Sequence, residues 1–209
     1  MDNEHLVFKP VPINEWPDMQ ALFEDCPFRG CWCMYWRSNR ADFDKGMGEG
    51  NMRAMQQAIE SGTVPGLLAY RDGKPVGWVS VGSREDFTAL ERSRILKRFD
   101  DQPVWSIVCF LAAKSERGKG ILSSLIRGAV KYAASKGASI VEVYPLIPEE
   151  SRNPRMSSYM GMLSTFKKLG FQEVARPSRM RAVVRFFIQD LKIQNLDCQI
   201  LSKDTEVVS

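Results

Sequence analysis

The sequence predicts an α+β fold: a mixed, mostly antiparallel sheet of about seven strands, with one central β-α-β parallel crossover and flanking helices. Three observations predict it. Residues 104–112 are nearly all apolar, which is typical of a strand buried on both faces. Residues 121–136 repeat apolar side chains near the helical period, and 139–144 is strand-like again, so these segments form a parallel unit. Residues 72–74 (Asp-Gly-Lys) join two alternating runs and indicate a hairpin.

The other elements follow in order along the chain. Pro12 closes a first strand, Asn14 can cap the next helix, and Gly62 ends another. Gly137 and Gly170 end the two later helices. We expect strands at 5–11, 66–70, 75–81, 104–112, 139–144, 171–175 and 179–188, and helices at 14–24, 51–60, 84–99, 121–136 and 155–169. Residues 1–188 are predicted to form one domain, and the tail at 189–209 has no clear pattern.

The composition is that of an ordinary globular protein of 209 residues, enough for one well-formed core. Its net charge of +4 fits a site for a small polyanion and is too weak to indicate nucleic acid. No apolar run approaches the roughly 18 residues of a membrane span, and the N-terminus does not resemble a signal peptide. We therefore expect a cytoplasmic protein without membrane contact. A homodimer is compatible with the sequence, which does not decide the oligomeric state.

Histidine and cysteine usage narrows the chemistry. His5 is the only histidine, which disfavours a Ser-His-Asp or Cys-His hydrolase. Three of the five cysteines, Cys26, Cys31 and Cys33, lie close together in the sequence. A structural zinc site requires four ligands, and a disulfide between Cys31 and Cys33 would be strained. No metal is expected, and the role of the three thiols stays open.

The most informative motif is Arg117-Gly118-Lys119-Gly120, between the buried strand and the helix that follows it. A helix N-terminus presents unpaired backbone N–H groups and a positive dipole end, and glycines let a phosphate approach them closely. The motif therefore predicts a pyrophosphate site. Alternatively, the glycines only make a tight turn. The P-loop and dinucleotide-binding patterns do not fit, since Gly120 is followed by Ile121 and a third spaced glycine is missing.

Residues 104–170 resemble the core of the GNAT N-acetyltransferase superfamily. The preceding hairpin and the later FKKLGF segment at 166–171 match in order and distance. One signature position departs from the family, because Leu122 stands where glycine or alanine is usual. The signature falls on Arg117, Gly118, Lys119, Gly120, Ile121 and Leu122.

The resemblance implies acetyl-CoA as co-substrate. The backbone of Phe110, Leu111 and Ala112 would pair with the pantetheine arm, and the amides of residues 118–122 would hold the pyrophosphate. The thioester would lie where the two parallel strands splay apart. At Phe166, which would also contact the donor, the family usually has a tyrosine that protonates the departing thiolate. Phenylalanine has no proton to give, so this role is vacant at Phe166.

Two other residues are candidates for the proton transfers that amine acetylation requires. Tyr159 lies two helical turns before Phe166 and could supply a phenol; alternatively it only caps the helix start. Glu142 is a carboxylate in an apolar strand, which is costly unless it is paired or solvated in a site. We expect it to deprotonate the acceptor ammonium, with a glutamate that merely binds an arginine as the alternative.

Residues 26–37 are rich in cysteine and aromatic side chains. In the family, this segment often lines the acceptor side of the cleft. We therefore expect Trp32, Tyr35 and Trp36 to form flat walls for the acceptor, joined by Tyr144 from the strand at 139–144. Alternatively, these aromatic side chains fill a core beneath a loop.

The leading hypothesis is an acetyl-CoA-dependent N-acetyltransferase acting in a ternary complex. Its acceptor would be a small amine, such as an amino sugar, a polyamine or an antibiotic, or else a peptide amine. A second hypothesis is a non-catalytic acyl-CoA sensor on the same fold, which Phe166 keeps open. A third is a thiol- or metal-responsive protein built on residues 26–33.

Overall fold

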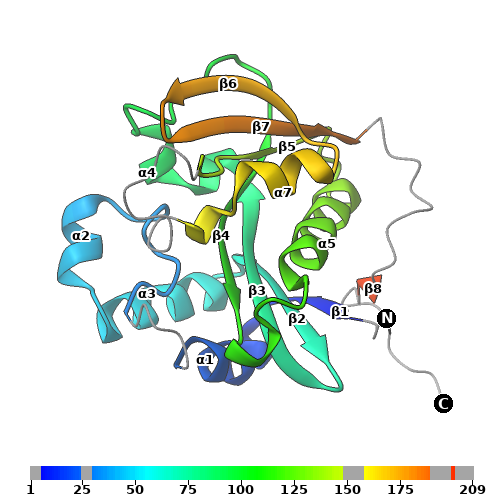
Figure 1. The fold of residues 1–209 in the computed structure, drawn as a ribbon. Helices are drawn as coiled ribbons and strands as arrows, with labels where there is room; N and C mark the ends of the chain where they lie inside the picture. Colours follow the sequence, from blue (N-terminus) through cyan, green and yellow to red (C-terminus); the bar gives the residue numbers. More distant parts are fainter. Residues whose placement is uncertain (1–5, 25–29, 148–157, 189–198, 201–209) are drawn as a thin grey trace.

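The computed structural model describes residues 6–24, 30–147, 158–188 and 199–200. Eight strands form one sheet in the order β6-β7-β5-β4-β3-β2-β1-β8 (Figure 1). Only the pairs β4–β5 and β1–β8 run parallel, which confirms the predicted mixed sheet and its central crossover. The strands are β1 (Val7–Pro10), β2 (Gly66–Arg71), β3 (Lys74–Ser83), β4 (Trp105–Ala112), β5 (Ile140–Val143), β6 (Gln172–Ser178), β7 (Arg181–Phe187) and β8 (Gln199–Ile200).

Helices cover both faces of the sheet. The longest, α5 (Ile121–Ser135), connects β4 to β5, as the apolar period predicts. The other helices are α1 (Trp16–Glu24), α2 (Arg40–Lys45), α3 (Glu49–Glu60), α4 (Thr88–Glu91) and α7 (Leu163–Lys168). Short 3-10 turns are η1 (Ile13–Glu15), η2 (Arg84–Asp86), η3 (Lys114–Glu116) and η5 (Ser158–Met160). In the part of the chain that the structure describes, no helix is long and apolar enough to cross a membrane.

Alternation along the strands divides the core into two sides. Leu67 and Ala69 of β2 pack with α5 in one cluster, whereas Leu68 and Tyr70 pack with α1 and α3 in another. A third cluster, around Phe87 and Tyr144, lies beneath α4 on the same side as α1 and α3, since Tyr144 alternates with residues of the α5 cluster. The sheet is therefore buried on both faces, which explains its long apolar strands.

The central strands separate after a short parallel ladder. β4 pairs with β5 only from Trp105↔Val141 to Ile107↔Val143, after which β5 ends and β4 continues to Ala112. In the β3–β4 ladder, Ser80 pairs with Cys109 and Val81 with Ile107, so Val108 is an extra, bulged residue. The bulge interrupts the alternation, and Val108 and Cys109 both pack away from α5.

Two predicted helices are wrong in extent. Residues 84–99 contain only η2 and the four-residue α4, because buried Arg84 and Leu96 anchor the rest as an irregular connection. The helix predicted at 155–169 begins outside the described residues and is divided into η5 and α7. Gly161 between them has φ +78°, which a right-handed helix excludes. Neither α2 nor β8, the only described part of the tail, was predicted.

Candidate active site

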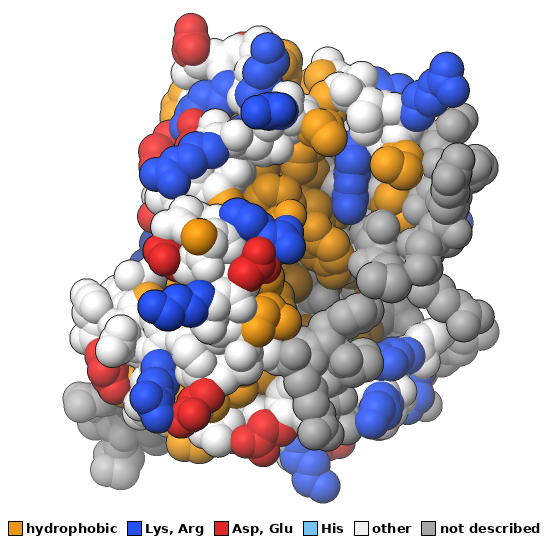
Figure 2. Space-filling view, turned by 90° about the vertical axis from the view of Figure 1, so that its left-hand side faces the viewer, with side chains coloured by type: hydrophobic (Ala, Val, Ile, Leu, Met, Phe, Trp, Pro, Cys, Tyr) orange, Lys and Arg blue, Asp and Glu red, His pale blue; other side chains and the backbone are white. Residues whose placement is uncertain are grey.

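One face of the molecule is hollowed. Figure 2 shows a hollow lined by hydrophobic side chains on the face that lies at the left in Figure 1, with charged side chains around it. On the side of β4 away from α5, the half-buried apolar side chains include Tyr35, Cys109, Leu111 and Tyr159. They come from three separate parts of the chain, which only the tertiary structure brings together.

The glycine turn lies where the sequence predicts it, between β4 and α5. Gly118 (φ +81°) and Gly120 (φ +83°) are left-handed, a conformation that glycine adopts without strain. Gly120 is the N-cap of α5 and, as a glycine, has no side chain to bond the first amides of the helix. A Cβ built on either glycine would meet no atom within 4 Å. A phosphate group could therefore approach the backbone at these two glycines, at the start of a 15-residue helix, without meeting a side chain of either.

Glu116, which directly precedes the glycine turn, is held in place by two basic side chains. Its side chain is buried, and Oε2 accepts a hydrogen bond from Arg71 Nη2 on β2 at 3.1 Å. Lys119 Nζ lies 3.9 Å from the other carboxylate oxygen. These cations neutralise a carboxylate that would otherwise repel an anion at this helix end. Arg117 and Lys119 are exposed.

The edge of β4 that continues past the end of β5 forms the second part of the candidate site. Phe110, Leu111 and Ala112 are half-buried and lie beyond the end of β5, as the resemblance implies for a strand that pairs with a pantetheine arm. Phe166 is fully buried and contacts Phe110 and Phe171, with ring centroids 6.3 and 5.2 Å apart. Phe166 can contribute an apolar surface beside β4, but it has no proton to donate. Of the remaining signature residues, Ile121 is buried and Leu122 half-buried.

Tyr159 lies on the opposite side of β4 from the glycine turn. It belongs to η5 and not to the helix of Phe166, so the predicted shared helical face is wrong. Its ring is half-buried, and the Arg181 guanidinium lies 5.7 Å from the ring centroid. Burial raises the pKa of Tyr159 to about 12, with Arg181 acting in the opposite direction. The phenol is therefore protonated throughout the neutral range.

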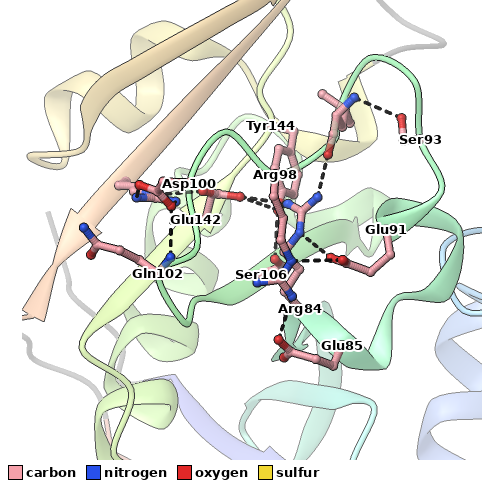
Figure 3. A network of polar contacts seen from close by, with 12 residues as sticks. Arg84, Glu85, Glu91, Ser93, Arg98, Asp100, Gln102, Ser106, Glu142 and Tyr144 are labelled. Atoms are coloured by element: carbon pink, nitrogen blue, oxygen red, sulfur yellow. Dashed lines mark hydrogen bonds and ion pairs between the residues drawn. The ribbon is translucent and has the colours of Figure 1, made fainter.

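Glu142 is the centre of a buried network of polar side chains (Figure 3). Arg84 Nη1 donates to Oε1 at 2.9 Å, and Arg185 Nε donates to Oε2 at 2.7 Å. Arg185 also forms a bidentate pair with Asp100. This is the arginine-bound geometry named above as the alternative. Both carboxylate oxygens are therefore already bound to guanidinium groups. The role of Glu142 as a base stays a prediction.

Tyr144 belongs to the same network. Its hydroxyl donates to Glu142 Oε1 at 2.7 Å and lies 2.9 Å from Ser106 Oγ, which joins β5 to β4 next to the point where the strands separate. The Tyr144 side chain is completely buried, and burial raises its pKa well above the usual value. Direct contact between Tyr144 and an acceptor stays a prediction, for which this structure provides no exposed surface.

The three predicted aromatic wall residues have different positions. Trp32 is buried and stacks on Trp16 and Phe23, with centroids 5.6 and 5.2 Å apart. Trp36 is buried in the cluster beneath α4. Tyr35 is half-buried and packs edge-on against Trp36. It packs against the same cluster as Tyr159. Of the three, Tyr35 is the one that is not buried, and its contact with an acceptor stays a prediction.

Several residues of this region were not found from the sequence. Arg84, Arg185 and Asp100 complete the network, and Cys109 brings a thiol to the side of β4 away from α5. Arg185 could have been found from the sequence, because it is a charged residue within the apolar strand β7. The same argument selected Glu142. Cys109 had none, because the bulge at Val108 determines its direction. No group of three or more metal-binding side chains occurs among the described residues, which exclude Cys26.

Comparison with known proteins gives the family. Residues 16–153 match the family model described as acetyltransferase (GNAT) family, which covers more than half of the chain. The chain therefore belongs to the GNAT acetyltransferase family and is an acyltransferase of this type. Acetyl-CoA is the acyl donor of that family. No curated protein matches the chain.

Solved structures agree in fold. A GNAT acetyltransferase from Listeria monocytogenes is 12% identical over 87% of this chain and 94% of its own, with a TM-score of 0.53. The PaiA N-acetyltransferase from Thermoplasma acidophilum, in complex with coenzyme A, is 12% identical over 87% and 98%, with a TM-score of 0.51. An agmatine N-acetyltransferase mutant in its apo form is 10% identical over 87% and 99%, with a TM-score of 0.52. At these identities the likeness shows the fold alone.

Proposed function

We propose that this protein transfers the acetyl group of acetyl-CoA to a primary amine, by direct attack of the amine in a ternary complex. The observation that carries the proposal is the glycine-capped start of α5 beside the free side of β4. A donor held at both places would have its pyrophosphate at the helix end and its pantetheine arm along residues 110–112. Its thioester would then lie near the gap between β4 and β5.

The residues around the turn suit a CoA phosphate by geometry and charge. The amides of Gly118, Gly120, Ile121 and Leu122 would donate hydrogen bonds, whereas the amide of Lys119 is bonded to the Glu116 carbonyl at 3.2 Å. The exposed Arg117 and Lys119 side chains would add positive charge. Leu122 is half-buried at the first turn of α5, so its larger side chain can be accommodated. Phe110 and Phe166 offer apolar contact beside the arm.

Tyr159 is the proposed proton donor. In this mechanism the neutral amine attacks the thioester carbonyl, the C–S bond breaks, and the sulfur takes a proton from the Tyr159 phenol. The surplus proton of the amine leaves to water, with Glu142 as the alternative acceptor, and water returns a proton to the Tyr159 phenolate. The raised pKa keeps the phenol protonated at neutral pH, and Tyr159 lies on the acceptor side of β4. Because coenzyme A is a fair leaving group, the expected contribution is modest.

The proposed acceptor is a small amine or a peptide amine. Structural neighbours include an agmatine N-acetyltransferase and the NatC complex bound to Gag peptide and CoA, and they support both kinds of acceptor without deciding between them. The half-buried Tyr35 and Tyr159 favour an acceptor with an apolar or cationic part beside the reacting nitrogen. We further propose that the protein acts in the cytoplasm without a metal, either as a monomer or as a homodimer.

Titration of acetyl-CoA into the protein tests the proposal, followed by turnover with a panel of amines. Released coenzyme A should be measured by chromatography, because the protein's five cysteines would react with a thiol reagent. Saturable binding with amine-dependent release of coenzyme A is expected. Binding without release from any amine would favour a non-catalytic acyl-CoA sensor, for which Phe166 is the supporting observation. Absence of binding would refute the assignment of the turn.

A further inference from the structure

Two thiols that are far apart in the sequence meet beside the candidate site. Cys33 follows Trp32 in the cysteine–aromatic segment, and Cys109 lies on β4 directly after the bulge. The Cys109 side chain is close enough to Cys33 to raise the pKa of its thiol. Both pack in the cluster formed with α1 and α3, and both are free thiols in this structure. Two thiols in contact across separate elements are an arrangement that a disulfide requires.

Contacts with β3 position both cysteines. Trp78 Nε1 on β3 donates to Cys33 Sγ at 3.2 Å. Trp78 pairs with Leu111 across the ladder, and Ser80 pairs with Cys109 two residues away on the same face. Without the bulge at Val108, Cys109 would share the face of Ile107 and point toward α5. The bulge therefore places the Cys109 thiol on the side of Cys33.

The backbone at Cys33 is a second, independent observation. Trp32 (φ +46°) and Cys33 (φ +54°) are two consecutive non-glycine residues in the left-handed region, where bulky side chains are rare. Surrounding structure must impose such a conformation, and it is concentrated at functional sites. In this segment it directs the Cys33 thiol inward to Trp78 and Cys109.

The accessibility of the two thiols differs. Cys33 is 5% exposed, whereas Cys109 is half-buried among the residues on the acceptor side of β4. Cys109 also packs against the same cluster as Tyr159, the proposed proton donor. An oxidant that approaches this side of β4 would meet the half-buried Cys109 before the buried Cys33.

We propose that Cys33 and Cys109 form a reversible disulfide, a modification site that joins the acceptor-side segment to β4 and slows the enzyme. The oxidant is a peroxide or a small-molecule disulfide. With a peroxide, the Cys109 thiolate attacks one oxygen, the O–O bond breaks, and a sulfenic acid forms. The Cys33 sulfur then attacks the Cys109 sulfur and releases water. In total, two thiols lose two electrons and two protons, and the peroxide is reduced to water.

The electrostatics supports this order of events. The Cys109 side chain and burial raise the pKa of the Cys33 thiol well above its ordinary value, so Cys33 is a poor first nucleophile. Once Cys109 is oxidised, Cys33 is left as the neighbouring nucleophile. Cross-linking should therefore become faster as the pH rises.

The experiment uses the full chain, first reduced and then treated with oxidised glutathione or hydrogen peroxide. Peptide mapping without reductant identifies the cross-link, and its formation does not depend on acetyl-CoA. The expected product joins the peptides of Cys33 and Cys109 with loss of two hydrogen atoms, and dithiothreitol reverses it. A cross-link between Cys31 and Cys33, or glutathione adducts without a cross-link, would overturn the proposal.

Cys109→Ser removes the half-buried partner and should abolish the cross-link, whereas Cys198→Ser, in the tail, should retain it. If Cys33→Ser destabilises the fold, fragmentation of the cross-linked peptide still distinguishes Cys33 from Cys31, and a cross-link from Cys31 to Cys109 would overturn the pairing. A thermal melt checks that Cys109→Ser folds. The effect on turnover rests on the proposed function: oxidation should lower kcat/KM by about 10- to 100-fold, because small displacements at an active site have effects of this size. An unchanged rate in cross-linked protein would refute only the regulatory part. Failure of the cross-link in an active enzyme would refute the disulfide and leave the transferase.

Discussion

The two sides of β4 are built in different ways. On the α5 side, the glycine turn at 117–120 is an open site made of backbone amides, and side chains contribute mainly charge. On the other side, residues 30–37, Tyr159 and the Glu142 network form a site made of side chains from many elements. Most of those side chains are buried, and only a few, including Tyr35 and Tyr159, are half-exposed.

This difference matches the task proposed for each side. A donor common to a whole family can be held by backbone geometry, which tolerates many changes of side chain. An acceptor that differs between members must be recognised by side chains, whose positions depend on contacts that are distant in the sequence. The Glu142 network stabilises this second side at its base, where Tyr144 and Ser106 join β5 to β4. If the two sides are independent, substitutions on one should leave the task of the other unchanged.

The largest effect is expected for Glu142→Gln. It places a neutral amide between the buried Arg84 and Arg185, and should lower the free energy of unfolding by about 3–5 kcal/mol. Chemical denaturation measures this. The matched control is Arg98→Ala, whose more exposed pairs with Glu85 and Glu91 should contribute about 0.2–1 kcal/mol. A stable Glu142→Gln protein that loses only the pH dependence of kcat/KM would instead identify Glu142 as the base.

The next effect concerns the donor alone. Gly120→Asp should weaken acetyl-CoA binding about tenfold or more, or ~1.4 kcal/mol, because a carboxylate would occupy the place of the pyrophosphate. Calorimetric titration measures the change in Kd. Gly137→Asp is the control beyond the other end of α5, since its φ is also +83° and its Cβ would also meet no atom within 4 Å. Equal weakening by both variants would contradict a phosphate site at Gly120.

A smaller effect is expected for Tyr159→Phe. The variant should lower kcat about tenfold with little change in acetyl-CoA affinity, a loss below the usual range for a general acid because thiolate is a fair leaving group. Steady-state kinetics with a saturating amine measures it, with Tyr132→Phe on α5 as the control. A changed Kd for acetyl-CoA with unchanged kcat would show that Tyr159 has a binding role.

The smallest effect is a change in stability at alkaline pH. Because the folded pKa of Tyr159 is raised from 10.0 to about 12, the folded state retains this proton longer than the unfolded chain does. Stability from this group is complete below pH 10.0 and is lost as the pH rises toward 12. Between pH 10.0 and about 11, ionisation of Tyr159 should lower the free energy of unfolding by less than about 1.4 kcal/mol, since one pKa unit corresponds to that energy. The Tyr159→Phe variant should not show this part of the decrease. Parallel denaturation curves for both proteins would contradict the burial of the phenol.

The sequence by itself determined the sheet class, the hairpin, the β-α-β crossover and the position of the glycine turn. These depend on local patterns, namely the apolar period of a strand or helix and the backbone freedom of glycine, which neighbouring residues already specify. For that reason the position of the glycine turn, where we propose that the donor phosphates bind, follows from local sequence alone.

Only the tertiary structure decided the other side. It divided the helix predicted at 155–169 at Gly161, paired Glu142 with two arginines, and buried Trp32 and Trp36 while leaving Tyr35 half-exposed. It also turned Cys109 toward Cys33 through one extra residue in β4. The energies of buried charges and of aromatic packing depend on partners that are far apart in the chain. A single sequence specifies these partners only through the complete fold.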